Sequence, residues 1–333
     1  MTIPKPPRLS ILVVSYNTRD LTIACLSSIV RETKHVSYEI IVVDNASTDG
    51  SREAIADHPA KPNLIALGEN IGFARANNLA ARAAKGDLIL LLNPDTEVRG
   101  GAIDKIAGFA ARRPQSMLWG GRTIFPDGTL NPSSAWAKMT LWRLFCRASG
   151  LTGLFPDSAV TNGEAYGGWK RDSERAVDIV SGCFLLIDRE LWTRLGGFDP
   201  LFFMYGEDAD LCLRARLLGA RPRVTPEATI VHYGGASERV REDKLVKLLA
   251  GKAMLIARHF PTVAVPVGLA LQALWPLSRA AATLCLARWR KSHESLEAAR
   301  IWLAVWKRRE EWYLGYGDAD TENSLKKALA RRS

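Results

Sequence analysis

A run of five consecutive apolar residues that ends abruptly in polar ones constrains this chain more than any other feature. Leu88–Leu92 follows the turn-like Lys85-Gly86-Asp87 and precedes Asn93-Pro94-Asp95. An unbroken apolar run of this length is typical of a strand buried on both faces of a parallel sheet. Such sheets hold their ligands at the carboxyl ends of the strands. The run predicts a parallel sheet with Asn93 and Asp95 at its ligand-binding edge, although it also fits an ordinary buried strand that ends in a polar turn.

The first hundred residues alternate between strand-like and helix-like segments. The predicted strands are residues 9–15, 38–44, 63–67 and 88–92, and the predicted helices are residues 18–32, a helix opening at 49–51, and residues 73–84. Strands separated by helices are typical of a doubly wound parallel sheet with right-handed crossovers. The sequence therefore predicts an α/β fold.

Beyond Arg99 this alternation stops. Residues 126–169 are rich in Gly, Pro, Ser and Trp without a steady period, which predicts an irregular segment and, in part, a mobile loop over a site. We expect a strand over residues 177–187 and helices over residues 190–195 and 208–218.

The overall composition is that of a folded protein with a sizeable core. The chain has 333 residues, of which 24% are charged and 47% hydrophobic, enough for one large domain or two ordinary ones. Its five cysteines are scattered without CxxC spacing, which predicts reduced thiols in a cytosolic protein and no zinc site. The proline-rich start runs straight into a strand, so we expect no signal peptide.

The last part of the chain is basic and apolar. From Glu238 onward there are 18 Lys and Arg against 10 Asp and Glu, which accounts for +8 of the net charge of +10. Residues 263–287 are strongly apolar, but Pro276 and Arg279 near the middle would be costly in a membrane-spanning helix. Tryptophans beside Lys and Arg favour an interfacial anchor on an anionic membrane surface. A soluble helical subdomain or a dimer interface is the alternative, and the apolar interleaving disfavours a nucleic-acid partner.

Four polar positions stand at strand ends or before a helix. Asp44 ends a strand, Asp95 follows another, Glu207-Asp208 precedes a helix and His232 follows Thr229-Ile230-Val231. Each alone could be a turn, a helix cap or a satisfied histidine. Their ordered combination indicates a site.

This combination resembles the family 2 inverting glycosyltransferases of the GT-A fold, over roughly residues 9–237. Within that family the segments look most like bacterial rhamnosyltransferases that build cell-surface polysaccharide. The matching segments are Val14-Ser15-Tyr16-Asn17; Val43-Asp44-Asn45-Ala46-Ser47-Thr48-Asp49-Gly50-Ser51; Asn70-Ile71-Gly72-Phe73-Ala74-Arg75-Ala76-Asn77-Asn78; Asn93-Pro94-Asp95; Ser181-Gly182-Cys183-Phe184; Gly196-Gly197-Phe198-Asp199; Gly206-Glu207-Asp208-Ala209-Asp210-Leu211; and His232.

The resemblance implies a role for each matching residue. It implies that Asp44 binds the nucleobase, that Asp208 is the general base and that Glu207 orients the acceptor. The remaining nucleotide-sugar contacts that it implies are Ser15, Asn17, Asn70, Arg75, Asn77, Asn78, Asn93 and Asp95, and the remaining acceptor contacts are Ser181 and Gly182.

The chain departs from the family pattern at two places. The family's metal motif is Asp-x-Asp, whereas this chain has Asn93-Pro94-Asp95 and keeps one carboxylate. The resemblance implies a Mg²⁺ or Mn²⁺ site on Asp95 and His232, with the carbonyl oxygen of Asn93, that binds free metal more weakly. The family usually carries an Arg just before the last Asn of its helix motif, where this chain has Asn77.

The resemblance implies transfer of a sugar, most readily rhamnose from dTDP-rhamnose, to a lipid-linked saccharide. A UDP-sugar donor and a catalytically inactive nucleotide-binding relative are the alternatives. We expect residues 1–100 to form the nucleotide-sugar-binding half of a GT-A domain, residues 101–237 the acceptor-binding and catalytic half, and residues 238–333 a helical, membrane-associating extension. This organisation implies a cytoplasmic protein held peripherally on the inner face of the cell membrane, with homo-oligomer formation left open.

Overall fold

The computed structural model describes residues 7–234, 240–290 and 293–316, and these residues form two compact units. The first unit comprises residues 1–136, 170–203 and 208–237, and the second comprises residues 137–169, 204–207 and 238–333. Residues 137–169, which the sequence boundaries grouped with 101–237, therefore cluster with the tail instead. The first six residues, residues 235–239 and residues 317–333 of the predicted tail lie outside the described ranges.

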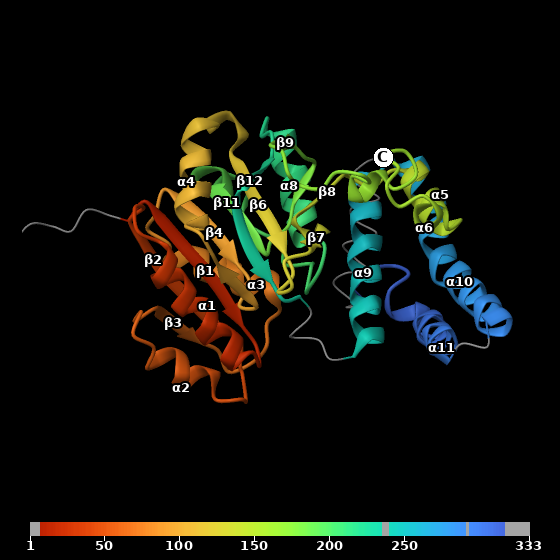
Figure 1. The fold of residues 1–333 in the computed structure, drawn as a ribbon, viewed down its shortest axis with the longest axis horizontal. Helices are drawn as coiled ribbons and strands as arrows, with labels where there is room; N and C mark the ends of the chain where they lie inside the picture. Colours follow the sequence, from red (N-terminus) through yellow and green to blue (C-terminus); the bar gives the residue numbers. More distant parts are fainter. Residues whose placement is uncertain (1–6, 235–239, 291–292, 317–333) are drawn as a thin grey trace, which may run out of the picture. The chain divides into compact units, whose positions relative to one another are not determined.

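The first unit is built on one mixed sheet (Figure 1). Its order is β3-β2-β1-β4-β11-β6-β12-β5, with β7 paired to β6 and β9 to β12, while β8 and β10 pair separately. The strands are β1 (Leu9–Ser15), β2 (Tyr38–Asp44), β3 (Asn63–Ala66), β4 (Leu88–Leu92), β5 (Thr96–Val98), β6 (Leu118–Ile124), β7 (Leu130–Asn131), β8 (Ala135–Trp136), β9 (Arg175–Ala176), β10 (Ile179–Val180), β11 (Phe184–Asp188) and β12 (Arg223–His232).

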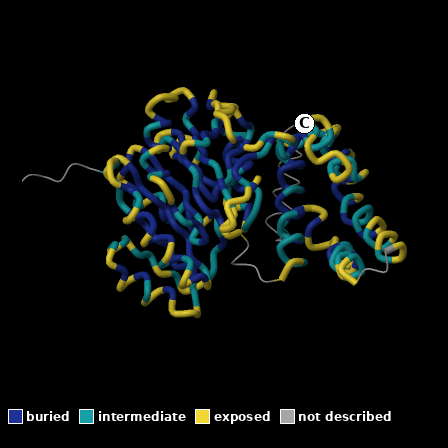
Figure 2. The backbone as a smooth tube through the Cα atoms, viewed as in Figure 1, coloured by how far each residue is buried: buried dark blue, intermediate teal, exposed yellow. Residues whose placement is uncertain are grey.

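Helices cover this sheet. The helices of the first unit are α1 (Arg19–Glu32), α2 (Ser51–Ala56), α3 (Phe73–Ala83), α4 (Ala102–Arg112), α7 (Arg189–Leu195) and α8 (Glu207–Leu217), with 3-10 turns at Pro114–Ser116 and Pro132–Ser134. Apolar residues of α1 and α4, such as Ile29 and Phe109, pack against Ile11 and Leu90 in one cluster, while α3 contacts β1 and β2. The buried strands form the continuous dark core of Figure 2.

The predicted parallel strands of the first hundred residues are confirmed, but the single strand predicted over residues 177–187 is not. β1 pairs in parallel with β2 and β4, and β2 pairs in parallel with β3. Beyond β4 the sheet is mixed, because β11 runs antiparallel to both β4 and β6. The single strand predicted over residues 177–187 is wrong: Ser181, Gly182 and Cys183 form a turn that separates β10 from β11. This turn becomes part of the candidate site.

The second unit is helical. It contains α5 (Leu141–Ala148), α6 (Leu151–Leu154), α9 (Arg241–His259), α10 (Val265–Arg290) and α11 (His293–Lys307), with 3-10 turns at Gly163–Ala165, Thr262–Ala264 and Arg309–Glu311. One core joins Leu144 of α5 to Ile256 and Leu269, and another joins Leu249 to Val305 and Trp312. The irregular segment expected over residues 126–169 is thus partly helical, and α5 buries one side in this unit.

Helix α10 is the longest helix in the described part of the chain and exposes much of its apolar surface. The stretch from Thr262 to Trp289 is long and apolar enough to cross a membrane by length and composition alone, with 22% of its most apolar window buried. Val267 and Leu274 are 50% and 47% exposed and lie two helical turns apart on one face. Pro276 lies inside the helix.

All five cysteines are free thiols. Cys25, Cys146, Cys183 and Cys212 are buried, whereas Cys285 on α10 is exposed. Burial is the main reason that the pKa of Cys25 is raised to about 12.

Candidate functional site

The polar residues predicted at strand ends meet at one edge of the sheet in the first unit. Ser15 pairs in register with Asp44, and Leu12 with Leu91, so β1, β2 and β4 end at the same edge. β12 runs parallel to β6, and β6 and β4 both run antiparallel to β11, so β12 also ends at this edge, at His232. The topology therefore gathers residues that are far apart in sequence.

Asp44 offers a buried acceptor at this edge. Its side chain is almost fully buried, and Oδ2 accepts a 3.3 Å hydrogen bond from the backbone N–H of Ser47. Oδ1 is buried without a hydrogen-bond partner in the described structure. An unsatisfied buried carboxylate oxygen is costly unless a ligand donates to it, and a nucleobase N–H is such a donor.

Asn70 shapes the loop beside Asp44. Its Oδ1 accepts hydrogen bonds from Asn45 Nδ2 at 2.8 Å and from the N–H of Gly72 at 3.0 Å, while Asn45 Oδ1 accepts from the N–H of Ile71. Gly72 has a φ of +83°, and a Cβ there would lie 2.7 Å from the carbonyl oxygen of Phe203. Asn45 was not predicted as a site residue, and its place next to Asp44 is the signal that could have found it.

Ser15 and Asn17 are used within the protein. The Ser15 hydroxyl lies 3.0 Å from the Thr22 hydroxyl and 3.3 Å from that of Thr18. Asn17 Oδ1 accepts a 2.8 Å hydrogen bond from the N–H of Thr48 and so fixes the loop that follows β2. These contacts make both residues supports of the edge.

Helix α3 does not present its predicted residues as a group. Arg75 is exposed, whereas Asn77 is buried and donates 3.0 Å to the carbonyl of Phe73 one turn earlier. Asn78 bonds the backbone of Phe198 twice, donating to its carbonyl at 2.8 Å and accepting from its N–H at 2.9 Å. The nucleotide contacts of Asn77 and Asn78 stay predictions, and in this structure the amide nitrogen of Asn77 and both amide atoms of Asn78 bond the protein backbone.

The turn after α7, which leads to Phe198, is held by Arg214. Arg214, which pairs with the buried Asp210 at 2.7 Å, donates to the carbonyls of Leu195 and Gly197 at 2.8 and 2.9 Å. This guanidinium ties α8 to the turn after α7, so the start of α8 has a defined position. Sequence reasoning missed Arg214, although its i,i+4 spacing from Asp210 was visible.

The turn between β10 and β11 connects the remaining site residues. The backbone N–H of Asn93 donates to the carbonyl of Cys183 at 3.1 Å. One residue earlier, the N–H of Gly182 donates to Asp208 Oδ2 at 2.9 Å. This turn therefore brings the start of α8 beside the end of β4. Ser181 and Gly182 bond the Asp208 carboxylate, and their predicted contacts with the acceptor stay predictions.

Two backbone N–H groups hold the Asp208 carboxylate at the start of α8. Its Oδ1 accepts a 2.7 Å hydrogen bond from the N–H of Ala209. Burial raises the pKa of Asp208, and the donors of Gly182, Ala209 and Ser181 offset part of that rise. A carboxylate has about four acceptor positions, so it can still accept a proton from a ligand hydroxyl. Glu207, the buried first residue of α8, precedes it in the chain.

Asp95 and His232 interact with each other at the same edge of the sheet. Thr96 pairs with His232 across β5 and β12, and this places His232 Nε2 3.4 Å from Asp95 Oδ1. Burial alone would raise the pKa of Asp95 and lower that of His232. Cys183 and then Asp95 outweigh the burial of His232 and raise its pKa to about 10, while the hydrogen bond and charge of His232 outweigh the burial of Asp95 and lower its pKa.

These residues fit a divalent metal. His232 Nδ1 is buried without a hydrogen-bond partner, Asp95 supplies a carboxylate and the partly exposed Asn93 supplies an amide oxygen. Because the raised pKa of His232 keeps its ring protonated, metal binding there would release a proton. Within the described ranges no three His, Cys, Asp or Glu side chains cluster as a complete metal site. Such a metal would need further oxygens from a ligand and water.

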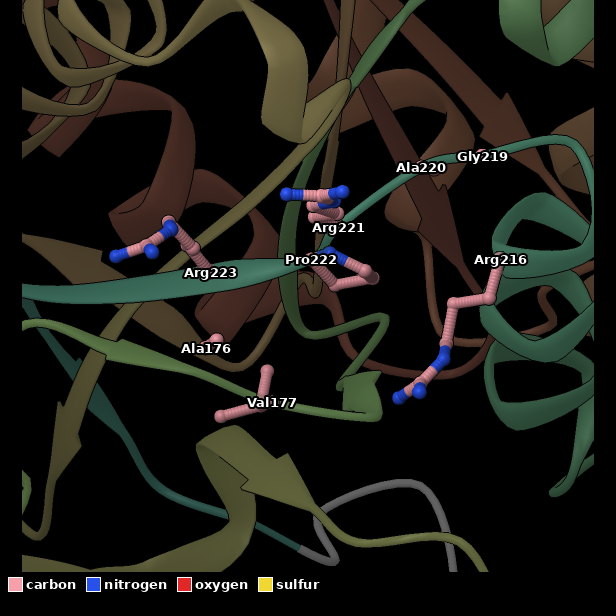
Figure 3. A pocket seen from close by; sticks show the side chains of 8 residues that line it. All are labelled: Ala176, Val177, Arg216, Gly219, Ala220, Arg221, Pro222 and Arg223. Atoms are coloured by element: carbon pink, nitrogen blue, oxygen red, sulfur yellow. The ribbon is translucent and has the colours of Figure 1, made fainter.

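A separate pocket lies away from this edge. It is lined by Ala176, Val177, Arg216, Gly219, Ala220, Arg221, Pro222 and Arg223. Figure 3 shows Arg216 and Arg223 on either side of Pro222, and they pair with Asp178 and Glu174 respectively. The pocket adjoins the first residue of β12, whereas His232 is the last, so it is not the site described above.

Comparison with known proteins identifies the family. The model of glycosyl transferase family 2 matches residues 10–168. The chain is 31% identical over 206 residues to N-acetylglucosaminyl-diphospho-decaprenol L-rhamnosyltransferase of Mycobacterium tuberculosis, a match covering 58% of this chain and 66% of that protein. It is 28% identical over 270 residues to the rhamnosyltransferase WbbL of Escherichia coli, covering 76% of this chain and 97% of that one.

A third relative is much longer. The O-antigen biosynthesis protein RfbC of Myxococcus xanthus is 29% identical over 242 residues, which cover 70% of this chain but 18% of that protein. The chain thus spans less than two thirds of both the Myxococcus and the Mycobacterium relatives.

Solved structures agree on the fold. A mannosyltransferase from Pyrobaculum calidifontis, in complex with GDP-Man and Mn²⁺, superposes with a TM-score of 0.54 at 21% identity, covering 99% of this chain and 88% of that one. The predicted GT-A fold is confirmed for the mixed α/β sheet and its helices. With the family model over residues 10–168 and the rhamnosyltransferase relatives, these findings show that the chain carries a glycosyltransferase family 2 domain and is similar to rhamnosyltransferases.

Proposed function

We propose that the protein is an inverting glycosyltransferase that transfers rhamnose from dTDP-rhamnose to a lipid-linked saccharide in cell-surface polysaccharide synthesis. The carrying observation is the Asp208 carboxylate, held by the N–H of Gly182 in a turn that also bonds the end of β4. The rhamnosyltransferase relatives support the sugar and the decaprenol-linked acceptor of the mycobacterial enzyme supports the lipid. A UDP-sugar is the alternative donor.

In this proposal Asp208 takes the proton from the attacking hydroxyl of the acceptor. Inversion requires one displacement at the anomeric carbon, so a single base on the acceptor side suffices. The raised pKa of Asp208 strengthens it as a base, and the two backbone donors fix its orientation before substrate arrives.

Asp44 and the Asp95–His232 pair act on the donor side. The free Oδ1 of Asp44 accepts a hydrogen bond from the nucleobase, which thymine, uracil and guanine can all donate. A divalent metal, Mg²⁺ or Mn²⁺, held by Asp95, His232 and Asn93 would supply positive charge for the leaving diphosphate. The positioning contacts of Asn70 and Asn17 keep the surrounding loops in place.

In this proposal the helical tail binds the inner face of the cell membrane. The exposed apolar side chains of α10, together with the basic excess of the tail, support binding to an anionic surface. The same helix is long enough to span a membrane, and we propose that it lies on the membrane surface instead.

A donor panel tests the proposed reaction. Release of nucleoside diphosphate is measured from dTDP-, UDP- and GDP-sugars with a polyprenyl-diphosphate saccharide acceptor and Mg²⁺, Mn²⁺ or EDTA. We expect turnover with dTDP-rhamnose and loss of turnover in EDTA. Turnover with a UDP-sugar instead would favour the alternative donor. If no donor releases nucleoside diphosphate in any condition, the protein is a catalytically inactive relative.

A further inference from the structure

A group of basic side chains in the second unit carries more charge than its neighbouring acid neutralises. Glu164 is buried, and its carboxylate pairs with Arg147 at 2.9 Å and with Lys252. Arg143 also acts electrostatically on Glu164, and Arg279 is repelled by Arg147. These four cations and one anion have a net charge of +3.

Arg279 is the unpaired member of this group. Its guanidinium makes no hydrogen bond or ion pair with the residues that the structure describes, and it is partly buried. A Cβ built on Gly153 of α6 would lie 3.3 Å from its Nη1, which places the guanidinium against that turn. Burial and the charge of Arg147 lower the pKa of Arg279. A desolvated cation without a counterion is costly, so an anionic ligand would relieve this cost.

Trp275, on the same helix as Arg279, contacts the guanidinium of Arg147. It lies one turn before Arg279 on α10, and the guanidinium carbon of Arg147 stands 4.9 Å from its ring centroid. Its indole Nε1 is buried without a hydrogen-bond partner in the described structure. The group therefore has hydrogen-bond donors that no described residue accepts from, which matches an anion with several oxygen atoms.

The surroundings of Arg279 are apolar and exposed. Leu154 and Phe155, which follow Gly153, are 71% and 55% exposed. Trp142 and Phe145 lie on α5, the helix that carries Arg147; they stack with their centroids 5.7 Å apart and are 51% and 44% exposed. Exposed apolar side chains beside an unpaired cation suit a molecule with an apolar body and an anionic head.

We propose that Arg147, Trp275 and Arg279 bind the phosphate monoester or diphosphate head group of a lipid. The net charge of +3 favours a multiply charged head group over a singly charged phosphodiester. The choice of a lipid carrier rests on the proposed function, in which the acceptor is lipid-linked.

Vesicle binding by the full-length protein tests this site. Phosphatidylcholine vesicles containing geranylgeranyl diphosphate are compared with vesicles that carry the same charge as phosphatidylglycerol, in EDTA and without nucleotide sugar. Arg279→Gln should weaken binding to the diphosphate vesicles about tenfold, the effect of losing one charge-assisted contact. Arg288→Gln, which removes an exposed cation from the same helix, should bind like the wild type.

Three results would overturn the proposal. Equal losses for Arg279→Gln and Arg288→Gln would mean general electrostatic attraction. Equal losses for Arg279→Gln on the two vesicle types would mean no preference for the diphosphate. Displacement by inorganic pyrophosphate at the concentration of the lipid would mean a site for the free anion.

Thermal unfolding separates binding from structural support. Because Arg279 is repelled by Arg147 in the free protein, Arg279→Gln should melt at or above the temperature of the wild type. A melting temperature several degrees lower would assign Arg279 a structural role and overturn the proposal. The vesicle assay contains no sugar donor, so it tests the lipid site independently of the reaction. Selective loss of lipid binding in Arg279→Gln, together with no turnover in the donor panel, would reject the reaction and keep the lipid site. Turnover in the donor panel without a selective loss of lipid binding would keep the reaction and reject the lipid site.

Discussion

The backbone N–H of Gly182 and the Oδ2 atom of Asp208 lie 2.9 Å apart and fix the carboxylate at the start of α8. The next residue, Cys183, accepts a hydrogen bond from the N–H of Asn93 at the end of β4. One three-residue turn thus couples Asp208, the proposed general base, to the strand end that carries Asn93.

Replacing Asp208 by Asn should abolish most of the activity and leave the fold intact. The amide cannot take a proton, so kcat should fall by about 10²–10⁴-fold. Turnover is measured with the best donor of the panel, and urea unfolding checks stability. Asp127→Asn, in an exposed turn, is the matched control. Retention of most of the activity by Asp208→Asn would remove it as the base.

Restoring a second carboxylate at Asn93 should tighten metal binding. Asn93→Asp adds a charge beside Asp95 and His232, so half-maximal activity should be reached at a Mn²⁺ concentration about tenfold lower. The measurement is activity against free Mn²⁺ after treatment with EDTA. An unchanged metal dependence would exclude Asn93 from the metal site.

Loss of the Asn78 amide should destabilise the first unit. Asn78→Ala leaves both the N–H and the carbonyl of Phe198 without their side-chain partner, which should lower the free energy of unfolding by about 1–3 kcal/mol. Urea denaturation provides the measurement. Arg75→Ala, an exposed change on the same helix, should have little effect. Equal effects of the two variants would show that these bonds do not contribute.

Glu164 should make the second unit sensitive to acid. Burial alone would raise the pKa of Glu164, but Arg147 and Lys252 outweigh it and lower the pKa from 4.5 to about 2. Stability from this group is therefore present above pH 4.5 and is lost as the pH falls towards 2. The shift corresponds to about 3 kcal/mol.

The Glu164→Gln variant isolates this effect. It should be less stable than the wild type at neutral pH, because Arg147 and Lys252 lose their counterion, and the difference should shrink between pH 4.5 and 2. Circular dichroism during denaturant unfolding at each pH gives the comparison. A difference that is independent of pH would contradict the assignment.

The exposed face of α10 should be required for binding to anionic membranes. Changing both Val267 and Leu274 to Gln removes apolar surface without opening the core, and flotation with phosphatidylglycerol vesicles should weaken by about tenfold or more. Leu217→Gln changes a residue that is 82% exposed in the first unit and serves as the control. Unchanged flotation of the double variant would reject this face as the anchor.

The parallel half of the fold was predictable because its apolar runs are unambiguous. Leu88–Leu92 and Tyr38–Asp44 appear with the predicted bounds. The strand predicted over residues 177–187 failed because a reversal at Ser181–Cys183 leaves the apolar character of the run unchanged. The helix Leu141–Ala148 was missed because the glycines, prolines and tryptophans around it obscure its period.

The candidate site was predictable as a set of strand ends. Asp44, Asp95 and His232 lie at one edge because topology alone places them there, and the turn at Gly182 brings Asp208 beside it. Residue types could not reveal which polar groups are already satisfied. The amide of Asn78 is hydrogen-bonded to the backbone of Phe198, which lies 120 residues away in the sequence.

The uneven burial of the thiols makes the protein chemically addressable at one described position. Alkylating reagents need an accessible thiolate, and Cys285 on α10 is exposed whereas the other four cysteines are buried. A polarity-sensitive maleimide dye should therefore attach to the native protein at Cys285. Its emission would report the environment of α10 directly, without any substitution in the chain.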